Sequence, residues 1–254
     1  MNPFELKHKR ALITGATRGI GLGIAHAMAQ AGAELILVGR DQAEMEKSAA
    51  ELRGLSASVS VASFDLLQTN KISSWFEEVC ATTGSPDILV NCAGINRRGN
   101  AVDLSLEEWN DVIALNTSAV FELSRSFARA RIAEAKSGKI INIASLMTAA
   151  ARPGVSPYAA SKGAVGQLTK ALAVEWARHN ILVNAIAPGY IDTPLNQPLI
   201  ADPAFDAWVQ KRCPLGRWGT PSDIAWPVVF LASAAADFIT GQVIFVDGGW
   251  LATF

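Results

Sequence analysis

The chain of 254 residues has little charge and no excess of either sign. Lys and Arg number 22 against 23 Asp and Glu, which gives a formal net charge of −1. A nucleic-acid-binding protein would carry a basic excess or a basic stripe to neutralise phosphates, and this sequence has neither. Hydrophobic residues make up 50% of the chain, which excludes intrinsic disorder. The apolar surface must therefore enter a large core, a membrane or a subunit interface.

The sequence also lacks a long hydrophobic run. A membrane-spanning helix needs about 20 consecutive apolar residues, and the most apolar stretch, 226–236, is interrupted by Pro227 and Ser233. Basic residues at 7–10 resemble the start of a signal peptide, but polar residues from Thr14 onward end the apolar run that follows. We therefore expect a cytoplasmic protein that does not enter a membrane.

Cysteine and histidine are scarce, with three of each. Cys80, Cys92 and Cys213 are odd in number and show no Cys-x-x-Cys spacing, and no two histidines stand at the spacing of metal ligands. The sequence therefore predicts neither a disulfide framework nor a metal site. We expect the cysteines to be small buried hydrophobic residues.

Short apolar runs alternate with longer amphipathic stretches along the chain. The runs do not alternate polar with apolar residues, as is typical of strands buried on both faces of a parallel sheet. We therefore expect one α/β domain over residues 1–254, a Rossmann-like, doubly wound parallel sheet of about seven strands with helices on both faces. The expected strands are 11–13, 34–38, 58–62, 88–90, 139–143, 181–186 and 243–246, and the expected helices are 19–31, 42–53, 71–81, 106–136, 158–178 and 221–232.

Residues 188–219 break this alternation. Five prolines interrupt a segment that also carries Phe205, Trp208 and Trp218. Long segments of this kind usually carry function, so we expect a substrate-binding lid, either a flexible loop or a second small helical layer.

A glycine-rich turn, residues 14–21, joins the first expected strand to the first helix. Glycines allow backbone N–H groups to approach a phosphate at the positive end of the helix dipole. The spacing Gly-x-x-x-Gly-x-Gly differs from the dinucleotide pattern Gly-x-Gly-x-x-Gly. The turn indicates a nucleotide site, and the alternative is a tight turn needed for helix packing.

The end of the second strand indicates which dinucleotide would bind. An acidic residue there grips the ribose of NAD, whereas an arginine accommodates the 2′-phosphate of NADP. Arg40 ends this strand and Arg18 lies in the glycine turn, which favours NADP(H) over NAD(H). The alternative is that Arg40 pairs with a surface acid such as Asp41, which could equally cap the next helix.

Tyr158 and Lys162 are four residues apart, which places them on one face of a helix. A nearby ammonium lowers a phenol pKa and makes the phenol useful as an acid or base. Ser145, residues 91–94 and residues 188–193 each follow an expected strand. Ligands of doubly wound sheets bind beyond those strand ends, so we expect all of these residues to open on one crevice.

Taken together, the motifs TGATRGIG, NCAG, ALNTS, YAASK and PGYIDT, with Ser145 between the third and fourth, resemble the short-chain dehydrogenase/reductase family over almost the whole chain. The resemblance implies a catalytic tetrad of Asn116, Ser145, Tyr158 and Lys162. Tyr158 would exchange a proton with the substrate oxygen, Ser145 would hydrogen-bond that oxygen, Lys162 would bind the nicotinamide ribose and lower the Tyr158 pKa, and Asn116 would anchor a water. One departure is Cys92, where the family usually has a second Asn, and we expect it to affect packing more than chemistry.

The resemblance also implies which residues contact the cofactor. Asp65 matches a position that touches the adenine, and its alternative role is to cap a helix. The expected cofactor-binding residues are Gly15, Thr17, Arg18, Gly19, Ile20, Gly21, Arg40, Asp65, Leu66, Asn91, Ala93, Gly94, Tyr158, Lys162, Pro188, Gly189, Ile191 and Thr193.

Within the family, several stretches are similar to the sugar-acid enzymes, the gluconate 5-dehydrogenases and 2-deoxy-D-gluconate 3-dehydrogenases. Arg97, Arg98 and Arg152 would clamp a carboxylate, or would instead lie at a subunit boundary or on a solvated loop. Trp208 would stack on a sugar or seal the cleft. With Ser145 and Tyr158, these residues form the expected substrate site.

We therefore expect an NADP(H)-dependent enzyme that interconverts an alcohol and a ketone on a sugar acid. The alternatives are a neutral-sugar or polyol dehydrogenase, a 3-oxoacyl-thioester reductase, or a catalytically silent dinucleotide-binding regulator. In the resembled family the long helices and the C-terminal tail form subunit contacts, so the resemblance implies a homotetramer, whose apolar interfaces would take part of the apolar surface.

Overall fold

The computed structural model describes residues 2–55 and 58–253, which form one seven-stranded, fully parallel sheet. Its order, β3-β2-β1-β4-β5-β6-β7, reverses direction between β1 and β4, and this order confirms the predicted doubly wound architecture. The strands are β1 Arg10–Thr14, β2 Glu34–Gly39, β3 Val59–Ser63, β4 Ile88–Asn91, β5 Gly138–Ile143, β6 Ile181–Pro188 and β7 Val243–Val246.

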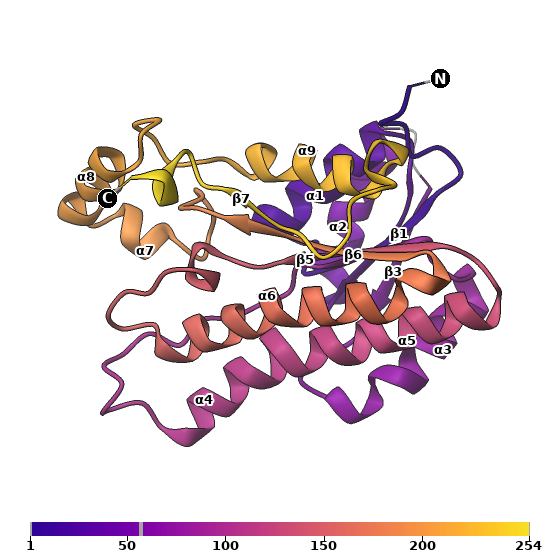
Figure 1. The fold of residues 1–254 in the computed structure, drawn as a ribbon, viewed down its shortest axis with the longest axis horizontal. Coiled ribbons are helices and arrows are strands. Elements are labelled where there is room, and N and C mark those ends of the chain that lie inside the picture. The colour runs from indigo at the N-terminus through magenta and orange to yellow at the C-terminus, as the bar shows by residue number, and fades with distance from the viewer. Residues whose placement is uncertain (1, 56–57, 254) are drawn as a thin grey trace.

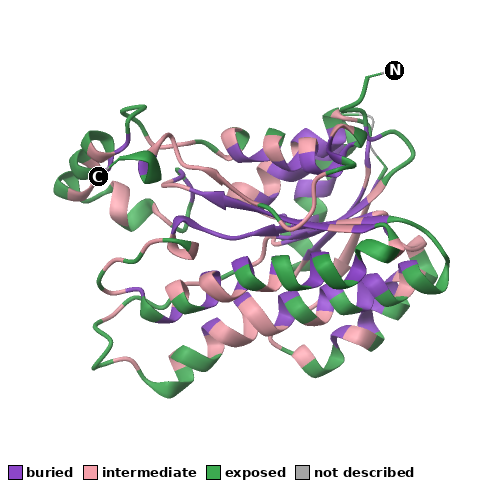
Figure 2. Ribbon diagram, in the orientation of Figure 1, coloured by how far each residue is buried: buried purple, intermediate pink, exposed green. Residues whose placement is uncertain are grey.

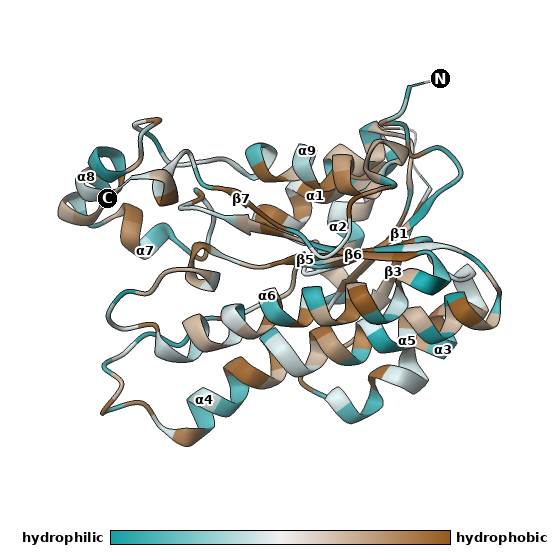
Figure 3. Cartoon of the chain, in the orientation of Figure 1, coloured by the Kyte–Doolittle hydropathy of each residue, from teal (hydrophilic) through white to brown (hydrophobic). Residues whose placement is uncertain are grey.

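Helices cover both faces of the sheet, which lies buried between them (Figures 1 and 2). One layer contains α1 Gly19–Gln30, α2 Gln42–Arg53 and α9 Pro221–Ala232, and the other contains α3 Ile72–Thr83, α4 Leu106–Ile113, α5 Ala119–Ala133 and α6 Ser156–Trp176. Apolar residues concentrate in the strands and on the helix sides that face them (Figure 3).

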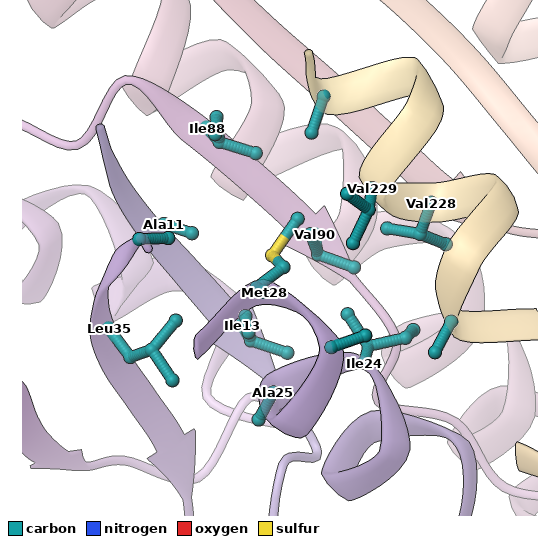
Figure 4. Packing of buried hydrophobic residues seen from close by; sticks show 14 of the residues in the cluster. Ala11, Ile13, Ile24, Ala25, Met28, Leu35, Ile88, Val90, Val228 and Val229 are labelled. Atoms are coloured by element: carbon teal, nitrogen blue, oxygen red, sulfur yellow. The ribbon is translucent and has the colours of Figure 1, made fainter. Parts of the chain in front are cut away.

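Successive residues of each strand enter opposite cores. Ala11 and Ile13 of β1 pack against α1 and α9, as Figure 4 shows, whereas Leu12 packs into the core under α3, α5 and α6. All three side chains are 0% exposed. Burial on both faces explains why the strand sequences show no alternation of polar and apolar residues.

The single helix expected over 106–136 is interrupted. After α4 the chain makes a π-helical turn, Ala114–Ser118, and then continues as α5, which ends at Ala133. A π turn adds a residue to the helical ladder and often marks a functional position. Asn116, a predicted tetrad residue, lies in this turn.

Residues 188–219 form a small helical layer at one end of the molecule, beside the C-terminal segment (Figure 1). They contain α7 Gln197–Ile200 and α8 Pro203–Arg212. Asp202 caps α8 by accepting hydrogen bonds from the N–H groups of Ala204 (3.0 Å) and Phe205 (3.3 Å). A bridge between Ile191 and Gly219 closes the base of the segment.

Across residues 2–55 and 58–253, none of the helices has both the length and the apolar content that a membrane crossing requires.

Candidate active site

A cavity of about 650 Å³ opens beyond the carboxyl ends of the central strands. Its lining combines the glycine turn, the loops that follow β2 to β6, and the start of α6. This is the crevice that the doubly wound topology predicts.

The glycine turn approaches this cavity in a way that only glycine permits. Gly15 and Gly19 have φ values of +68° and +55°, and a Cβ at Gly15 would lie 3.0 Å from the Cα of Ala93. A Cβ at Gly21 would overlap the carbonyl of Gly15. Arg18, at the N-cap of α1, makes no side-chain cap hydrogen bond, so the first N–H groups of α1 are available to a phosphate.

The residues that would choose the dinucleotide line the same cavity. Arg18 and Arg40 are exposed there, and neither forms an ion pair within residues 2–55 and 58–253. Asp41 caps α2 by accepting a hydrogen bond from the N–H of Glu44 at 3.1 Å. It does not form the alternative ion pair with Arg40. Asp65 accepts from the N–H of Leu67 at 3.1 Å within a turn and lines the cavity. It caps no helix, because the next helical residues, Thr69–Lys71, follow Gln68, so its alternative role as a helix cap is wrong.

The loop after β4 is held by a residue that the sequence reasoning did not select. Thr14 Oγ1 accepts hydrogen bonds from the N–H groups of Cys92 (2.9 Å) and Ala93 (3.0 Å). The side chain of Asn91 is directed into the interior, where it donates to Ser124 Oγ and to Asn142 Oδ1. Asn91 therefore supports the loop from behind, whereas Ala93 and Gly94 face the cavity.

Pro188, Gly189, Ile191 and Thr193 line the opposite wall of the cavity, at the end of β6. The turn there is close-packed, because a Cβ on Gly189 would lie 2.7 Å from the Cα of Asp247. Thr17, Ile20 and Leu66 also contribute to the lining.

Tyr158, Ser145 and Lys162 lie together on the cavity wall. Lys162 Nζ donates to the carbonyl of Ile143 at 2.7 Å and stands 5.6 Å from the ring centroid of Tyr158. Burial lowers the pKa of Lys162 to about 8. Burial raises the pKa of Tyr158 more than the hydrogen bond to Ser145 lowers it. The net shift of the Tyr158 pKa is therefore upward, opposite to the lowering expected from Lys162.

Asn116 is the fourth predicted tetrad residue and is completely buried behind the cavity. Its Oδ1 accepts from the N–H of Ile95 and its Nδ2 donates to the carbonyl of the same residue, both at 2.9 Å. Nδ2 also donates to Ser161 Oγ at 3.1 Å, and Ser161 in turn donates to the carbonyl of Tyr158 at 2.8 Å. Asn116 thus connects the π turn to the helix that carries Tyr158.

The cysteines only partly match the expectation of burial. Cys213 is buried, whereas Cys80 and Cys92 are partly exposed as whole residues, although the thiol of Cys92 is itself buried. Cys92 lines the cavity, and burial raises its thiol pKa to about 12 despite the opposing charge of Lys162. The Cys92 thiol therefore stays protonated and contributes an uncharged surface to the cavity lining.

The three predicted substrate arginines differ in their surroundings. Arg97 lines the cavity but pairs with Asp111 at 3.1 Å. Arg98 donates to the carbonyl of Leu195 and to Asn196 Oδ1, both at 3.3 Å. Burial and then the charge of Arg152 lower the Arg98 pKa. Arg152 lines the cavity, whereas Arg98 is absent from the lining that the described residues form, although its charge and that of Arg152 act on each other. Neither has an acidic partner in the described part of the chain.

Trp208 packs into an aromatic cluster next to the cavity and is absent from the lining that the described residues form. The cluster centres on Tyr190, which lines the cavity and lies 4.8 Å from Trp250 and 5.9 Å from Trp208, measured between ring centroids. Arg152 lies 5.4 Å above the ring of Phe205 in the same cluster. Tyr190 was missed by the sequence reasoning, although its motif PGYIDT was recognised.

The sheet order, the glycine turn and the Ser145/Tyr158/Lys162 group together define a dinucleotide-dependent oxidoreductase. A family profile described as Enoyl-(Acyl carrier protein) reductase matches residues 15–251. The chain belongs to the short-chain dehydrogenase/reductase family.

Individual relatives are similar over nearly the whole length. The gluconate 5-dehydrogenase of Gluconobacter oxydans (strain 621H) is 42% identical over 248 residues, covering 97% of this chain and 96% of that protein. The galactitol 2-dehydrogenase (L-tagatose-forming) of Cereibacter sphaeroides is 42% identical over 250 residues, covering 97% and 96%. A crystal structure of a gluconate 5-dehydrogenase from Burkholderia cenocepacia J2315 in complex with NADP and tartrate has a TM-score of 0.96 and 42% identity, covering 100% of this chain and 99% of that one.

Proposed function

We propose that this protein interconverts a secondary alcohol and a ketone on a sugar acid of the gluconate and 5-ketogluconate type, with NADP(H) as the cofactor. The observation that carries the substrate class is Arg152, which lines the cavity and has no acidic partner in the described part of the chain, while the charge of Arg98 acts on it from just outside the lining. The charge of Arg98 acts on both Tyr158 and Tyr190. A carboxylate near the reacting carbon would relieve the repulsion between the two arginines.

Arg97 is the weaker part of the expected clamp, because Asp111 already balances its charge. Trp208 would act indirectly, through Tyr190 and Phe205, by fixing the shape of the wall that carries Arg152. We propose that 188–219 is a substrate-binding lid within a single domain, with α7 and α8 as its rigid part.

The residues present fit NADP(H). Glycines at positions 15 and 21 keep the approach to the N-terminus of α1 free of side chains, and the N–H groups there would hold the pyrophosphate. Arg18 and Arg40 would bind the 2′-phosphate, with Asp65 and Leu66 at the adenine. NADP is the ligand named for the Burkholderia cenocepacia structure, which supports this choice over NAD(H).

The mechanism follows from the protonation states of the tetrad. The pKa of a phenol is ordinarily about 10 and burial raises that of Tyr158, so Tyr158 holds its proton at neutral pH and can donate it to a ketone oxygen. Ser145, hydrogen-bonded to Tyr158, orients that oxygen, and the Lys162 ammonium stabilises the phenolate that remains. The bound nicotinamide supplies or accepts the hydride. In the oxidation direction Tyr158 takes the proton from the alcohol.

We also propose that the protein works in the cytoplasm as a homotetramer. Its three cysteines are free, as suits a reducing compartment. Exposed apolar side chains on α5 and α6, among them Phe121 (38% exposed) and Val174 (83%), remain for a subunit interface.

A spectrophotometric panel tests the function. Purified protein would be mixed with D-gluconate, 5-keto-D-gluconate and related aldonic and ketoaldonic acids, each with both coenzymes, and the products would be identified by NMR. We expect turnover of at least one sugar acid, with NADP(H) preferred. Turnover confined to uncharged substrates would contradict the proposal.

A neutral-polyol dehydrogenase is the second candidate, because the galactitol 2-dehydrogenase shares the same 42% identity with this chain as the gluconate enzyme does. Such an enzyme has no need of an arginine clamp. Galactitol and L-tagatose therefore belong in the panel, and their turnover in preference to sugar acids would favour this candidate. A silent regulator would bind NADPH and oxidise it with none of these substrates.

A further inference from the structure

The hydroxyl of Thr148 lies between the two segments that carry three of the four tetrad residues. Thr148 ends the short 3-10 turn Leu146–Thr148, which follows Ser145. Its Oγ1 accepts a hydrogen bond from the N–H of Ser145 at 3.3 Å and donates one to the carbonyl of Lys162 at 3.0 Å. A single side chain thus joins the backbone at Ser145 to the backbone of α6.

The methyl group of Thr148 has a separate contact. It packs against Gly166, where a Cβ would collide with Thr148 Cγ2. The absence of a side chain at Gly166 therefore lets the Ser145 turn approach α6 closely. The two substituents of Thr148 have different partners, so their contributions can be separated by substitution.

The turn that Thr148 holds determines where the Ser145 hydroxyl points. Ser145 Oγ accepts from the N–H of Met147 at 3.1 Å, and the Ser145 side chain lies beside Tyr158, whose pKa it lowers. Ser145 and Tyr158 must reach the same substrate oxygen, and a misplacement of about 1 Å can cost on the order of 100-fold in rate. The distance between the turn and α6 therefore matters to the chemistry.

We propose that Thr148 is a positioning residue whose hydroxyl holds Ser145 in register with Tyr158 and Lys162. The inference rests on the proposed function, because it assumes that the tetrad carries the reaction. Thr148 acts through Ser145 and does not itself contact the reacting atoms.

Two substitutions separate the hydroxyl from the methyl. Thr148→Val keeps the branched shape and removes both hydrogen bonds, whereas Thr148→Ser keeps the hydroxyl and removes the contact with Gly166. For 5-keto-D-gluconate reduction we expect Thr148→Val to lower kcat about five- to tenfold, with the KM for NADPH unchanged. Thr148→Ser should stay within about twofold of wild type. A packing role predicts the reverse order, so greater impairment of Thr148→Ser, or a wild-type kcat for Thr148→Val, would overturn the proposal.

The pH profile gives a second readout that packing alone would not move. The Ser145 side chain lowers the pKa of Tyr158, so displacing it should shift the oxidation profile to higher pH in Thr148→Val but not in Thr148→Ser. An unshifted profile in Thr148→Val would also overturn the proposal. If the wild-type enzyme turns over no sugar acid, it is the proposed function that fails, and the two variants are then compared on the substrate that the panel identifies.

Discussion

At the scale of single residues, burial sets the protonation states on which the site depends. A phenol ordinarily has a pKa of about 10 and burial raises the pKa of Tyr158 further, so Tyr158 is neutral over the physiological range. Lys162 has a pKa of about 8, again because of burial. The pair is therefore prepared for proton donation, and the Lys162 charge is the group that titrates first as the pH rises.

The pH dependence of ketone reduction follows from these two groups. Below its pKa of about 8, Lys162 is charged and can stabilise the Tyr158 phenolate; above it, this support is lost. We expect kcat/KM for reduction, which reports ionisations of the free enzyme, to be level at neutral pH and to fall as the pH rises through about 8. A profile that stays level to about pH 9.5 would contradict this assignment.

Replacement of Tyr158 by Phe removes the proton donor and leaves the ring in place. We expect kcat to fall at least about 1000-fold, since general acid catalysis contributes factors of up to about 10⁴, while NADPH still binds. Stopped assays would measure turnover and fluorescence titration would measure NADPH binding. Retained activity would remove Tyr158 from the tetrad.

The arginines can be ranked by their partners. Arg98→Met and Arg152→Met should each raise KM for 5-keto-D-gluconate about tenfold or more, because a charge-assisted hydrogen bond is worth about 1.5–3 kcal/mol. Arg97→Met should have a smaller effect, since Asp111 already pairs with Arg97. Equal losses for a sugar acid and a neutral sugar would mean that Arg98 and Arg152 are structural.

At the scale of elements, the alternation of short apolar runs with longer amphipathic stretches was sufficient to predict the sheet and the helices that cover it. The interruption of the long helix at Asn116 was not predictable, because the π turn is associated with hydrogen bonds to Ile95, a tertiary contact that leaves no period in the sequence. From the sequence, we expect the prolines of 188–219 to interrupt regular secondary structure. Pro203 instead begins α8, where its missing N–H costs nothing.

The residues of the candidate site also fall into two groups, those that the sequence could predict and those that only the folded chain places. The glycine turn and the Tyr158/Lys162 pair have local spacing that can be read directly. Arg97 and Arg98 are neighbouring residues of the same type, so the sequence alone does not distinguish them. In the structure Arg97 pairs with Asp111, whereas Arg98 is under the influence of the Arg152 charge. Only the path of the chain decides this, as it also decides that Thr148 reaches Lys162.

The contact between the Ser145 turn and α6 makes a prediction about stability. Gly166→Ala should gain about 0.5–1 kcal/mol from helix propensity, but its Cβ would collide with Thr148. Overpacking of this kind costs about 1–3 kcal/mol, so we expect a net loss, measured by thermal denaturation. The double variant Gly166→Ala/Thr148→Ser should recover most of the loss. If Gly166→Ala alone were more stable than wild type, the turn that carries Thr148 would have moved away from the added Cβ, contrary to this prediction.

At the scale of the whole molecule, the two helical layers account for much of the low charge content. Apolar surface nevertheless remains, and a groove of about 730 Å³ lies along α5 and α6, bordered by Phe121, Arg125 and Leu168. This face is where we place a subunit contact of the proposed homotetramer, which sedimentation would test.

The central claim is that the crevice selects a carboxylate beside a reducible ketone. The most direct measurement compares kcat/KM, with NADPH, for 5-keto-D-gluconate and for L-sorbose, in which a hydroxymethyl group replaces the carboxylate. The arginine pair predicts a preference for the acid of about 100-fold or more. A ratio near one would contradict the account, because Arg98 and Arg152 would then contribute nothing to substrate choice.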